Sequence, residues 1–495
     1  MTKKGYRDKQ SRSTKSGSKK LTARLLEPDD AGAPRFSPKD PTAGDLQPHW
    51  EAGKIQVQFK IGTRPELLPS TATLAPEIRS VANVNLSNLN QLLQANGLRQ
   101  AEPSFQAVPS PADMTARVRD LQPPEPSNRE HFVILHFPED ADLVRISEEL
   151  NQLPEVERAV PVPKVLPPGT PGNEPRVGTS GQVTVDPGSG LENQWYIFRC
   201  NVDRIWDDEV SGEGVIIADI DWGYRITHQD LESRISVKHN SFDGGSDVTQ
   251  GDSVSHGTAV LGIAGGADNE LGMAGIAYGA TLWAIQADSG PGTPVGGDSW
   301  ANAIDWVRRT DSGGRRKIIN LEVQTGGFGN IEMVPAVNQA IKDAIASGVV
   351  VCVAAGNGDR DAGIDDLGDP IPPTGSILVG ATEYHPTENR RADFSNFGSG
   401  IIVSAPGDSS HDLTCSSAAD DGYMNAFGGT SGATPKIAAT AALMLSVNPR
   451  LSHAEVSAIL RDTGTFIVTD AAKPVGTFLN AEAAVREANS RADNQ

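Results

Sequence analysis

The chain has 495 residues, of which 38% are hydrophobic and 21% charged, and its formal net charge is −20 at pH 7. This length accommodates two or three domains, and the ordinary hydrophobic content predicts a sizeable buried core. The acidic balance argues against nucleic acid as the main partner, and no apolar run approaches the length of a membrane-spanning helix.

The N-terminal tail differs in charge from the rest of the chain. Residues 1–24 contain nine Lys or Arg residues and one Asp, and a Pro-rich stretch follows. Because this tail has no apolar periodicity, we expect residues 1–50 to be disordered. No apolar segment of a secretory signal follows Met1, and three cysteines require no disulfide, so we expect a cytoplasmic location or an unconventional export route.

Residues 51–165 predict a small α+β domain. Residues 55–59 alternate like a half-buried strand, and the leucines over 86–93 recur at helical spacing. A second strand is expected over 131–137, a second helix over 143–153 and a third strand over 155–160. This order is compatible with a ferredoxin-like split βαβ unit. Residues 166–192 are rich in Pro, Gly and Thr and predict an exposed linker to a domain over 193–490.

Four short segments in this last domain carry reactive side chains. The first is an apolar run over 215–220, broken only by Asp219, that ends in Asp221. It predicts a buried strand with a carboxylate at its carboxyl end, where α/β sheets place their ligands. Asp219 lies two residues earlier and therefore shares a strand face with Asp221.

The second segment begins with His256 and continues with small and apolar residues, which predicts a tightly packed helix. The unperturbed pKa of imidazole lies near neutrality, so His256 suits general-base work. In the third segment, Asn357 follows an apolar strand and Gly356, and its side-chain amide is a candidate donor. In the fourth, Ser431 lies between glycines and precedes Pro435, a residue suited to the first turn of a helix.

These four segments, Ala218–Gly223, Ser255–Thr258, Ala354–Asn357 and Gly429–Pro435, resemble those of the subtilisin-like serine proteases (subtilases), in which the triad order is Asp, His, Ser. The resemblance covers roughly 193–484. It implies an α/β fold with a doubly wound, mostly parallel sheet, preceded by a propeptide-type domain. It also implies the triad Asp221, His256 and Ser431, with Asn357 and the Ser431 N–H as oxyanion donors.

The resemblance further implies a substrate cleft. By register, Glu322, Val323 and Gln324 replace a Ser-Leu-Gly segment that pairs with the substrate backbone in many subtilases. Gly356, Gly368 and Asp369 would lie near the first specificity pocket. A carboxylate at Glu322, with acidic residues near Asp369, predicts a preference for Lys or Arg before the scissile bond; a solvated acidic loop is the alternative.

Two further positions match calcium ligands of several subtilases. They are Asp230 and Asn269, and hard cations need several more oxygen ligands than these two. The sequence therefore predicts no required cofactor and, at most, one structural calcium ion.

The expected function is a serine endopeptidase that forms an acyl-enzyme on a protein or peptide substrate. Its own N-terminal domain would act as an inhibitor, and self-cleavage is expected within 160–192. Three alternatives stay open: a peptide transferase or macrocyclase on the same scaffold, a non-catalytic binding protein, and a permanent interaction domain in place of the propeptide.

Overall fold

The computed structural model describes residues 50–68, 76–82, 84–104, 131–163, 165–166, 181–185, 192–251, 253–269, 271–287 and 296–493. The tail expected over 1–50 and most of the linker expected over 166–192 lie outside these residues. Among the helices of the described part, none has the length and apolar character needed to cross a membrane.

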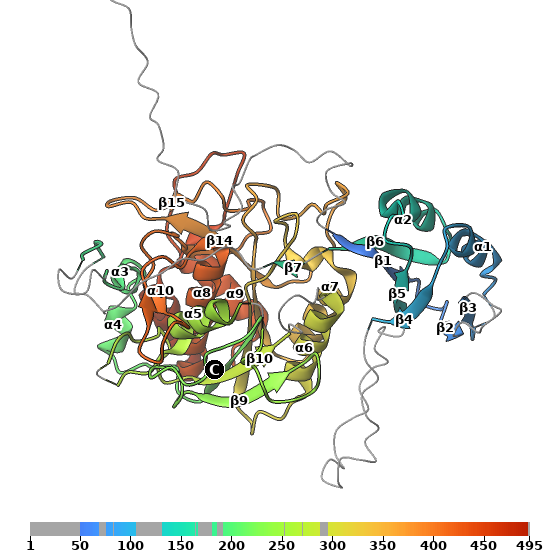
Figure 1. Ribbon diagram of the computed structural model, residues 1–495. Coiled ribbons are helices and arrows are strands. Elements are labelled where there is room, and N and C mark those ends of the chain that lie inside the picture. Colours follow the sequence, from blue (N-terminus) through green and yellow to red (C-terminus); the bar gives the residue numbers. More distant parts are fainter. Residues whose placement is uncertain are drawn as a thin grey trace, which may run out of the picture. The chain divides into compact units, whose positions relative to one another are not determined.

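The N-terminal domain is a four-stranded antiparallel sheet with the strand order β4-β5-β1-β6 (Figure 1). Its elements in chain order are β1 (Trp50–Phe59), α1 (Ser87–Ala95), β4 (Gln100–Pro103), β5 (Phe132–His136), α2 (Leu143–Asn151) and β6 (Val156–Pro163), with a hairpin of β2 (Pro65–Leu68) and β3 (Glu77–Ser80) before α1. This is the split βαβ arrangement expected from the sequence, with β4 as an additional strand.

The core of this domain contains the residues that alternate along the predicted strand and the leucines that recur at helical spacing. Alternate residues of β1, Ile55 and Val57, are fully buried, and the leucines Leu89 and Leu93 of α1 meet the same core. The second helix, α2, begins after Asp142, whose side chain accepts a hydrogen bond from the Arg145 N–H at 3.2 Å. These local signals explain why the helices could be predicted from the sequence.

The larger domain is built on a nine-stranded sheet with the order β19-β16-β14-β13-β11-β8-β10-β9 and with β15 on β14. Its strands are β8 (Val215–Asp221), β9 (Ile235–Asn240), β10 (Thr281–Gln286), β11 (Arg316–Leu321), β13 (Val350–Ala354), β14 (Ile377–Glu383), β15 (Arg390–Arg391), β16 (Val403–Pro406) and β19 (Thr477–Phe478). All pairs are parallel except β14 with β15. The doubly wound, mostly parallel sheet expected from the sequence is confirmed.

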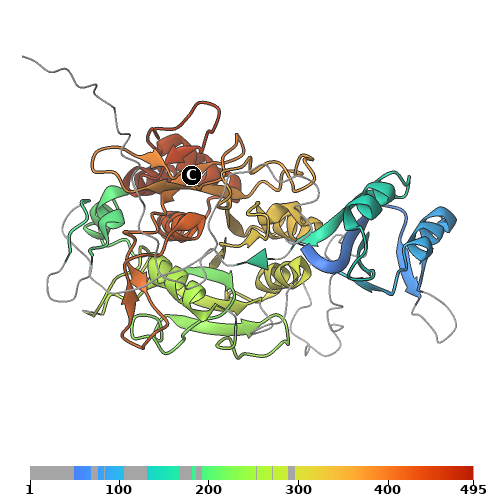
Figure 2. The same cartoon turned by 45° about the horizontal axis from the view of Figure 1, so that its top comes forward.

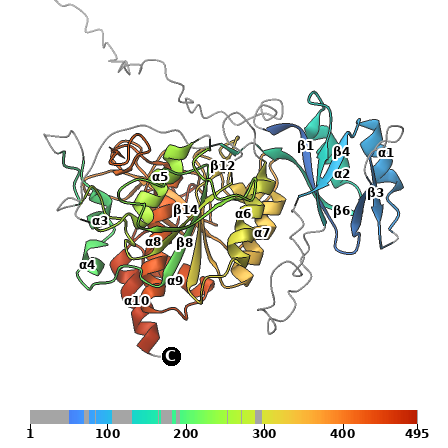
Figure 3. The ribbon, with the colours of Figure 1, turned by 60° about the horizontal axis from the view of Figure 1, so that its bottom comes forward.

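Helices cover both faces of this sheet (Figure 3). They are α5 (Val254–Gly265), α6 (Gly297–Arg309), α7 (Pro335–Ala346), α8 (Gly429–Val447), α9 (His453–Thr463) and α10 (Ala481–Asp493), with the short α3 (Trp195–Arg199) and α4 (Asp203–Trp206) before β8. The helices α6 and α7 pack together on one face, and α5, α8 and α10 lie on the other. Figure 2 shows α8 and the C-terminal helices, in orange and red, from a second direction.

The strand order reverses beside β8. From β8 the chain continues to β9 and β10 on one side, and then returns to β11 on the other side. In open α/β sheets the crevice at such a reversal, outside the carboxyl ends of the strands, is where ligands bind. Asp221 ends β8 at this point, and residues that follow β11 and β13 lie at the same edge.

Candidate active site

An acid and a base meet at the carboxyl end of β8. Asp221 Oδ2 lies 2.6 Å from Nδ1 of His256, the third residue of α5, and both side chains are fully buried. The other carboxylate oxygen, Oδ1, accepts a hydrogen bond from the Trp222 N–H at 2.6 Å. Both oxygens of Asp221 are therefore held, which fixes the imidazole ring.

The His256 ring is packed edge-on by two aromatic side chains. Trp222 and Phe427 each have ring centroids 5.2 Å from the imidazole centroid. The next residue, Gly257, lets α5 approach β8, because an added Cβ would lie 2.5 Å from the carbonyl oxygen of Gly223. His256 Nε2 is buried and has no hydrogen-bond partner in the described part of the chain.

The candidate nucleophile lies in the first turn of α8. Ser431 is fully buried, and its hydroxyl donates to the backbone carbonyl of Glu322 at 3.0 Å. Helix α8 begins at Gly429, so the first N–H groups of the helix have no intrahelical acceptor. In this state the Ser431 hydroxyl is bound to Glu322 and not to His256. Hydrogen bonds between a nucleophile and its base often form fully only when substrate is present.

Asn357 follows β13 and is oriented by α8. Its Oδ1 accepts hydrogen bonds from the Thr430 N–H at 2.8 Å and from the Thr430 hydroxyl at 3.0 Å. This arrangement leaves the amide nitrogen as the available donor. The preceding Gly356 has φ +97°, and an added Cβ would lie 2.5 Å from Asn396 Nδ2, so only glycine fits there.

The side chains of the expected cleft segment point into the protein, contrary to the sequence-based expectation. Glu322 is 1% exposed and its carboxyl group lies beside those of Asp219 and Asp221. Val323 is part of the core, and the Gln324 side chain accepts a hydrogen bond from the Asn357 N–H at 3.0 Å. Only the backbone of this segment is available for pairing: β12 (Gln324–Thr325) pairs antiparallel with β7 (Val165–Leu166).

Two acids of the loop after Asn357 form ion pairs within the protein. Asp365 is 2.5 Å from Arg158 of the N-terminal domain, and Asp366 pairs with Arg360. Gly368 and Asp369 are exposed, and the Asp369 N–H donates to Asp365. The buried Glu322 carboxyl and the paired Asp365 and Asp366 therefore do not contribute to the expected preference for Lys or Arg, whereas the exposed Asp369 carboxyl still could, and the preference stays a prediction.

The expected calcium ligands, Asp230 and Asn269, lie together, and the calcium site stays a prediction. Asp230 accepts hydrogen bonds from the Tyr423 hydroxyl at 2.8 Å, the Met273 N–H at 3.2 Å and the Asn269 amide at 3.3 Å. Among the described residues, these three hydrogen-bond donors contact the Asp230 carboxylate. Burial raises the pKa of Asp230, as expected for a carboxyl group enclosed by protein.

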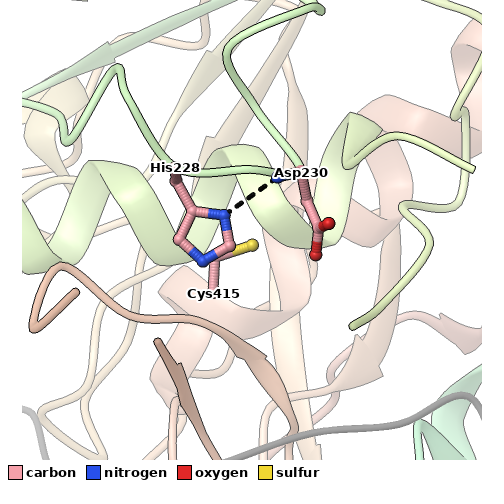
Figure 4. A group of neighbouring side chains, drawn as sticks. All are labelled: His228, Asp230 and Cys415. Carbon is pink, nitrogen blue, oxygen red and sulfur yellow. Dashed lines mark hydrogen bonds between the residues drawn. The ribbon is translucent and has the colours of Figure 1, made fainter. Parts of the chain in front are cut away.

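His228 and Cys415 lie beside Asp230 (Figure 4). His228 Nδ1 accepts a hydrogen bond from the Asp230 N–H at 3.1 Å, and Nε2 lies 2.7 Å from the Gly422 carbonyl. Both ring nitrogens are therefore used, and the trio is a structural contact between the loop before β9 and strand β17 (Thr414–Cys415).

A buried ion pair that was not predicted from the sequence lies near Ser431. Lys436 Nζ on α8 lies 2.7 Å from Asp412 Oδ2, both side chains are fully buried, and Nζ also donates to the carbonyls of Pro406 and Gly432. Burial raises the pKa of Asp412 to about 6, although Lys436 opposes this. The signal in the sequence was a lysine at the start of an otherwise apolar helix.

Replacing Lys436 by methionine should lower the free energy of unfolding by about 3–5 kcal/mol, because Asp412 then remains buried and unpaired. Urea unfolding of Ser431→Ala protein, in which autolysis is prevented, measures this. The double variant Lys436→Met/Asp412→Leu removes both charges and should recover most of the loss. Equal losses in the single and double variants would contradict this account.

The chain is similar in sequence to known proteins. Residues 212–486 match the model of the subtilase family. Subtilisin NAT from Bacillus subtilis subsp. natto is 33% identical over 263 residues, which are 52% of this chain and 62% of that protein. Subtilisin Savinase from Lederbergia lenta is 30% identical over 294 residues, which are 59% of this chain and 98% of that protein.

The match to one solved structure covers a larger share of this chain. Fervidolysin from Fervidobacterium pennivorans, described as a keratinolytic enzyme related to subtilisin, is 18% identical with a TM-score of 0.56, and the match covers 88% of this chain and 61% of that one. That coverage exceeds residues 212–486, so the shared fold reaches into the N-terminal domain. The match to the family model covers more than half of the sequence, and the chain therefore belongs to the subtilase family.

Proposed function

We propose that this protein is a serine endopeptidase that hydrolyses peptide bonds in a protein or peptide substrate. The observation that carries the proposal is the buried 2.6 Å contact between Asp221 and His256 at the strand-order reversal, with Ser431 at the start of α8. Family membership supports the same activity. The matched region spans 62% of the first curated relatives, so the activity is proposed from this chain's own residues.

In the proposed reaction, the Ser431 hydroxyl breaks its hydrogen bond to the Glu322 carbonyl and forms one to His256 Nε2. His256 takes the hydroxyl proton as Ser431 Oγ attacks the peptide carbonyl carbon, and Asp221 stabilises the resulting imidazolium. His256 then gives the proton to the leaving amine, and an acyl-enzyme remains. Water, deprotonated by His256, releases the acyl group and restores Ser431.

The oxyanion of the tetrahedral intermediate would be bound by Asn357 Nδ2 and the Ser431 N–H. Support comes from the two Thr430 hydrogen bonds that fix the Asn357 amide and from the position of Ser431 in the first turn of α8. Donors held in place before the reaction need no reorganisation when the charge develops.

Substitution of Asn357 separates this role from its structural one. Asn357→Asp keeps an acceptor for Thr430 but removes the amide donor, and kcat should fall about 100- to 1,000-fold with little change in KM. Thr430→Ser is a matched control because it retains both hydrogen bonds to Asn357. Steady-state kinetics on a peptide substrate measure the effect; a fall in kcat below tenfold for Asn357→Asp would reject the assigned role.

We further propose that the enzyme cleaves its own chain within 160–192 and that the N-terminal domain inhibits it before cleavage. Backbone pairing of β7 with β12 supports this, because it brings residues 165–166 to the segment that follows β11. Two contacts support the docking of the domain: Arg158 with Asp365 at 2.5 Å, and the Ala336 N–H with Gln56 at 2.7 Å.

Intact mass of purified wild type and Ser431→Ala, with and without a phosphonylating serine-protease probe, tests the proposed function. We expect wild type to be shortened by cleavage within 160–192 and to carry one probe adduct. The Ser431→Ala protein should remain full length and unlabelled. Two full-length, unlabelled proteins would contradict both self-processing and the activity of the purified chain.

A further inference from the structure

Three carboxyl groups meet behind the proposed triad. Asp219 and Asp221 belong to β8, and Glu322 immediately follows β11. The parallel pairing of the two strands sets Asn320 opposite Asp219, which brings Glu322 to the carboxyl end of β8, beside Asp219 and Asp221. The carboxyl oxygens of the three acids lie within 4.8 Å of one another, and all three side chains are buried.

The roles of the three acids differ. Asp221 has a hydrogen-bond partner on each oxygen, whereas Asp219 has one, the Asn320 amide at 3.0 Å from Oδ1. The remaining Asp219 oxygen and both Glu322 oxygens are buried with no other donor among the described residues. Two facing carboxylates cannot both be ionised there without a cation or a donor, so the geometry favours one proton held between Asp219 and Glu322.

Nearby charged and titratable groups favour retention of this proton. Asp221 faces the pair from β8, and His256 of α5 lies beyond Asp221. Tyr224 donates its hydroxyl hydrogen to the Asp219 carbonyl. In the described part of the chain, neither Asp219 nor Glu322 forms a salt bridge with lysine or arginine. Burial, followed by the charges of the neighbouring carboxylates, raises the pKa of both groups well above the usual range.

We propose that Asp219 and Glu322 form a proton-sharing carboxyl pair that positions the two halves of the triad. Asp219 precedes Asp221 by two residues on β8, and the Glu322 segment lies beside Ser431, whose hydroxyl donates to the Glu322 carbonyl at 3.0 Å until it turns to His256. The shared proton ties the end of β8 to the segment beside Ser431. This inference rests on the proposed function for its catalytic part, but the shared proton itself is a property of the folded protein.

Loss of the shared proton should separate these two segments. Above the pKa of the pair, two buried anions would face each other and Asp221, and their repulsion would move Glu322 away from β8. Activity and stability should both fall on the alkaline side. The folded-state pKa of Glu322 is raised, so its contribution to stability is complete below the unfolded value of 4.5 and is lost as pH rises toward the folded value.

The shared proton can be tested without activity. Full-length Ser431→Ala protein and the same protein with Glu322→Gln are unfolded in urea from pH 5 to pH 9. The introduced glutamine amide can donate to Asp219 but has no acidic proton to lose. For each pH we compare the unfolding equilibrium constants of the two proteins. Below the pKa of the pair, the constant of the Ser431→Ala parent should rise relative to that of the Glu322→Gln protein by up to about tenfold per pH unit.

Two further variants make this result decisive. Glu232→Gln makes the same chemical change at an exposed position in the loop before β9 and should show no pH trend. Asp219→Asn removes the other carboxyl group of the pair and should give the same pH dependence of the stability ratio. This variant keeps the test valid if the Glu322→Gln protein does not fold. Stability ratios independent of pH in both pair variants would overturn the inference.

The positioning role is tested by kinetics of the active enzyme. We expect the alkaline decline of kcat to shift to higher pH in Glu322→Gln, while KM follows that of wild type, because the Glu322 carboxyl is buried behind the triad. Superimposable kcat profiles would overturn the positioning role even if the stability trend appears. If wild type has no protease activity, the proposed function fails, and the stability experiment still decides whether the proton is shared.

Discussion

Replacement of His256 by alanine is expected to lower kcat on the order of 10⁶-fold, the scale on which a serine protease loses rate when its base is removed. The structure gives the imidazole one position, because Asp221 holds Nδ1 at 2.6 Å and Trp222 and Phe427 pack against the ring. No other imidazole of the described chain contacts Asp221, so no second group replaces the lost base.

The measurement compares single-turnover acylation of wild type and His256→Ala by a chromogenic peptide ester or amide. His453→Ala is the matched control: that histidine is also buried, but it bonds the Val351 N–H of β13, two strands from β8, and the Gly375 carbonyl. It should lose stability but retain kcat within about tenfold, as expected for a change remote from the chemistry. A His256→Ala protein that retains a hundredth of wild-type kcat would contradict the proposed mechanism.

The sequence was most informative where one strand end or one helix start carries one reactive side chain. The apolar run before Asp221 and the small residues after His256 predicted a strand and a helix; β8 ends at Asp221 as predicted, and α5 begins two residues before His256, at Val254. Their meeting follows from the parallel topology, since the carboxyl ends of the strands share one edge of the sheet. The alternation in β1 and the leucine spacing in α1 predicted the N-terminal domain in the same way.

Side-chain direction could not be predicted from register alone. Glu322 was expected in the substrate cleft, but Asn320 pairs opposite Asp219, and that pairing turns the next acidic side chain toward β8. Asp365 was expected to add acidity near the specificity pocket, but Arg158, 207 residues earlier in the sequence, pairs with it. The burial of Glu322 and the pairing of Asp365 both depend on residues distant in the sequence. A local sequence pattern gives no information about such partners.

The second large effect is expected for Asp221→Asn, which should lower kcat about 10⁴-fold, as for loss of the orienting carboxylate in other triads. The Trp222 N–H donates to Asp221 Oδ1 at 2.6 Å, so the single oxygen of an asparagine would remain there. The asparagine NH₂ would then face His256 Nδ1 and force that nitrogen to accept. The proton would move to Nε2, and the imidazole could no longer accept the Ser431 proton.

A double-mutant comparison separates this tautomer effect from general damage. Asp221→Asn and His256→Ala act on one unit, so the double variant should be no slower than His256→Ala alone. Thermal unfolding of each variant in the Ser431→Ala background shows whether the fold is retained. Because Asp219 and Glu322 hold their proton between themselves, neither can replace Asp221 beside Nδ1. A loss in Asp221→Asn of less than tenfold would therefore mean that another group orients His256, and it would contradict the assignment of Asp221.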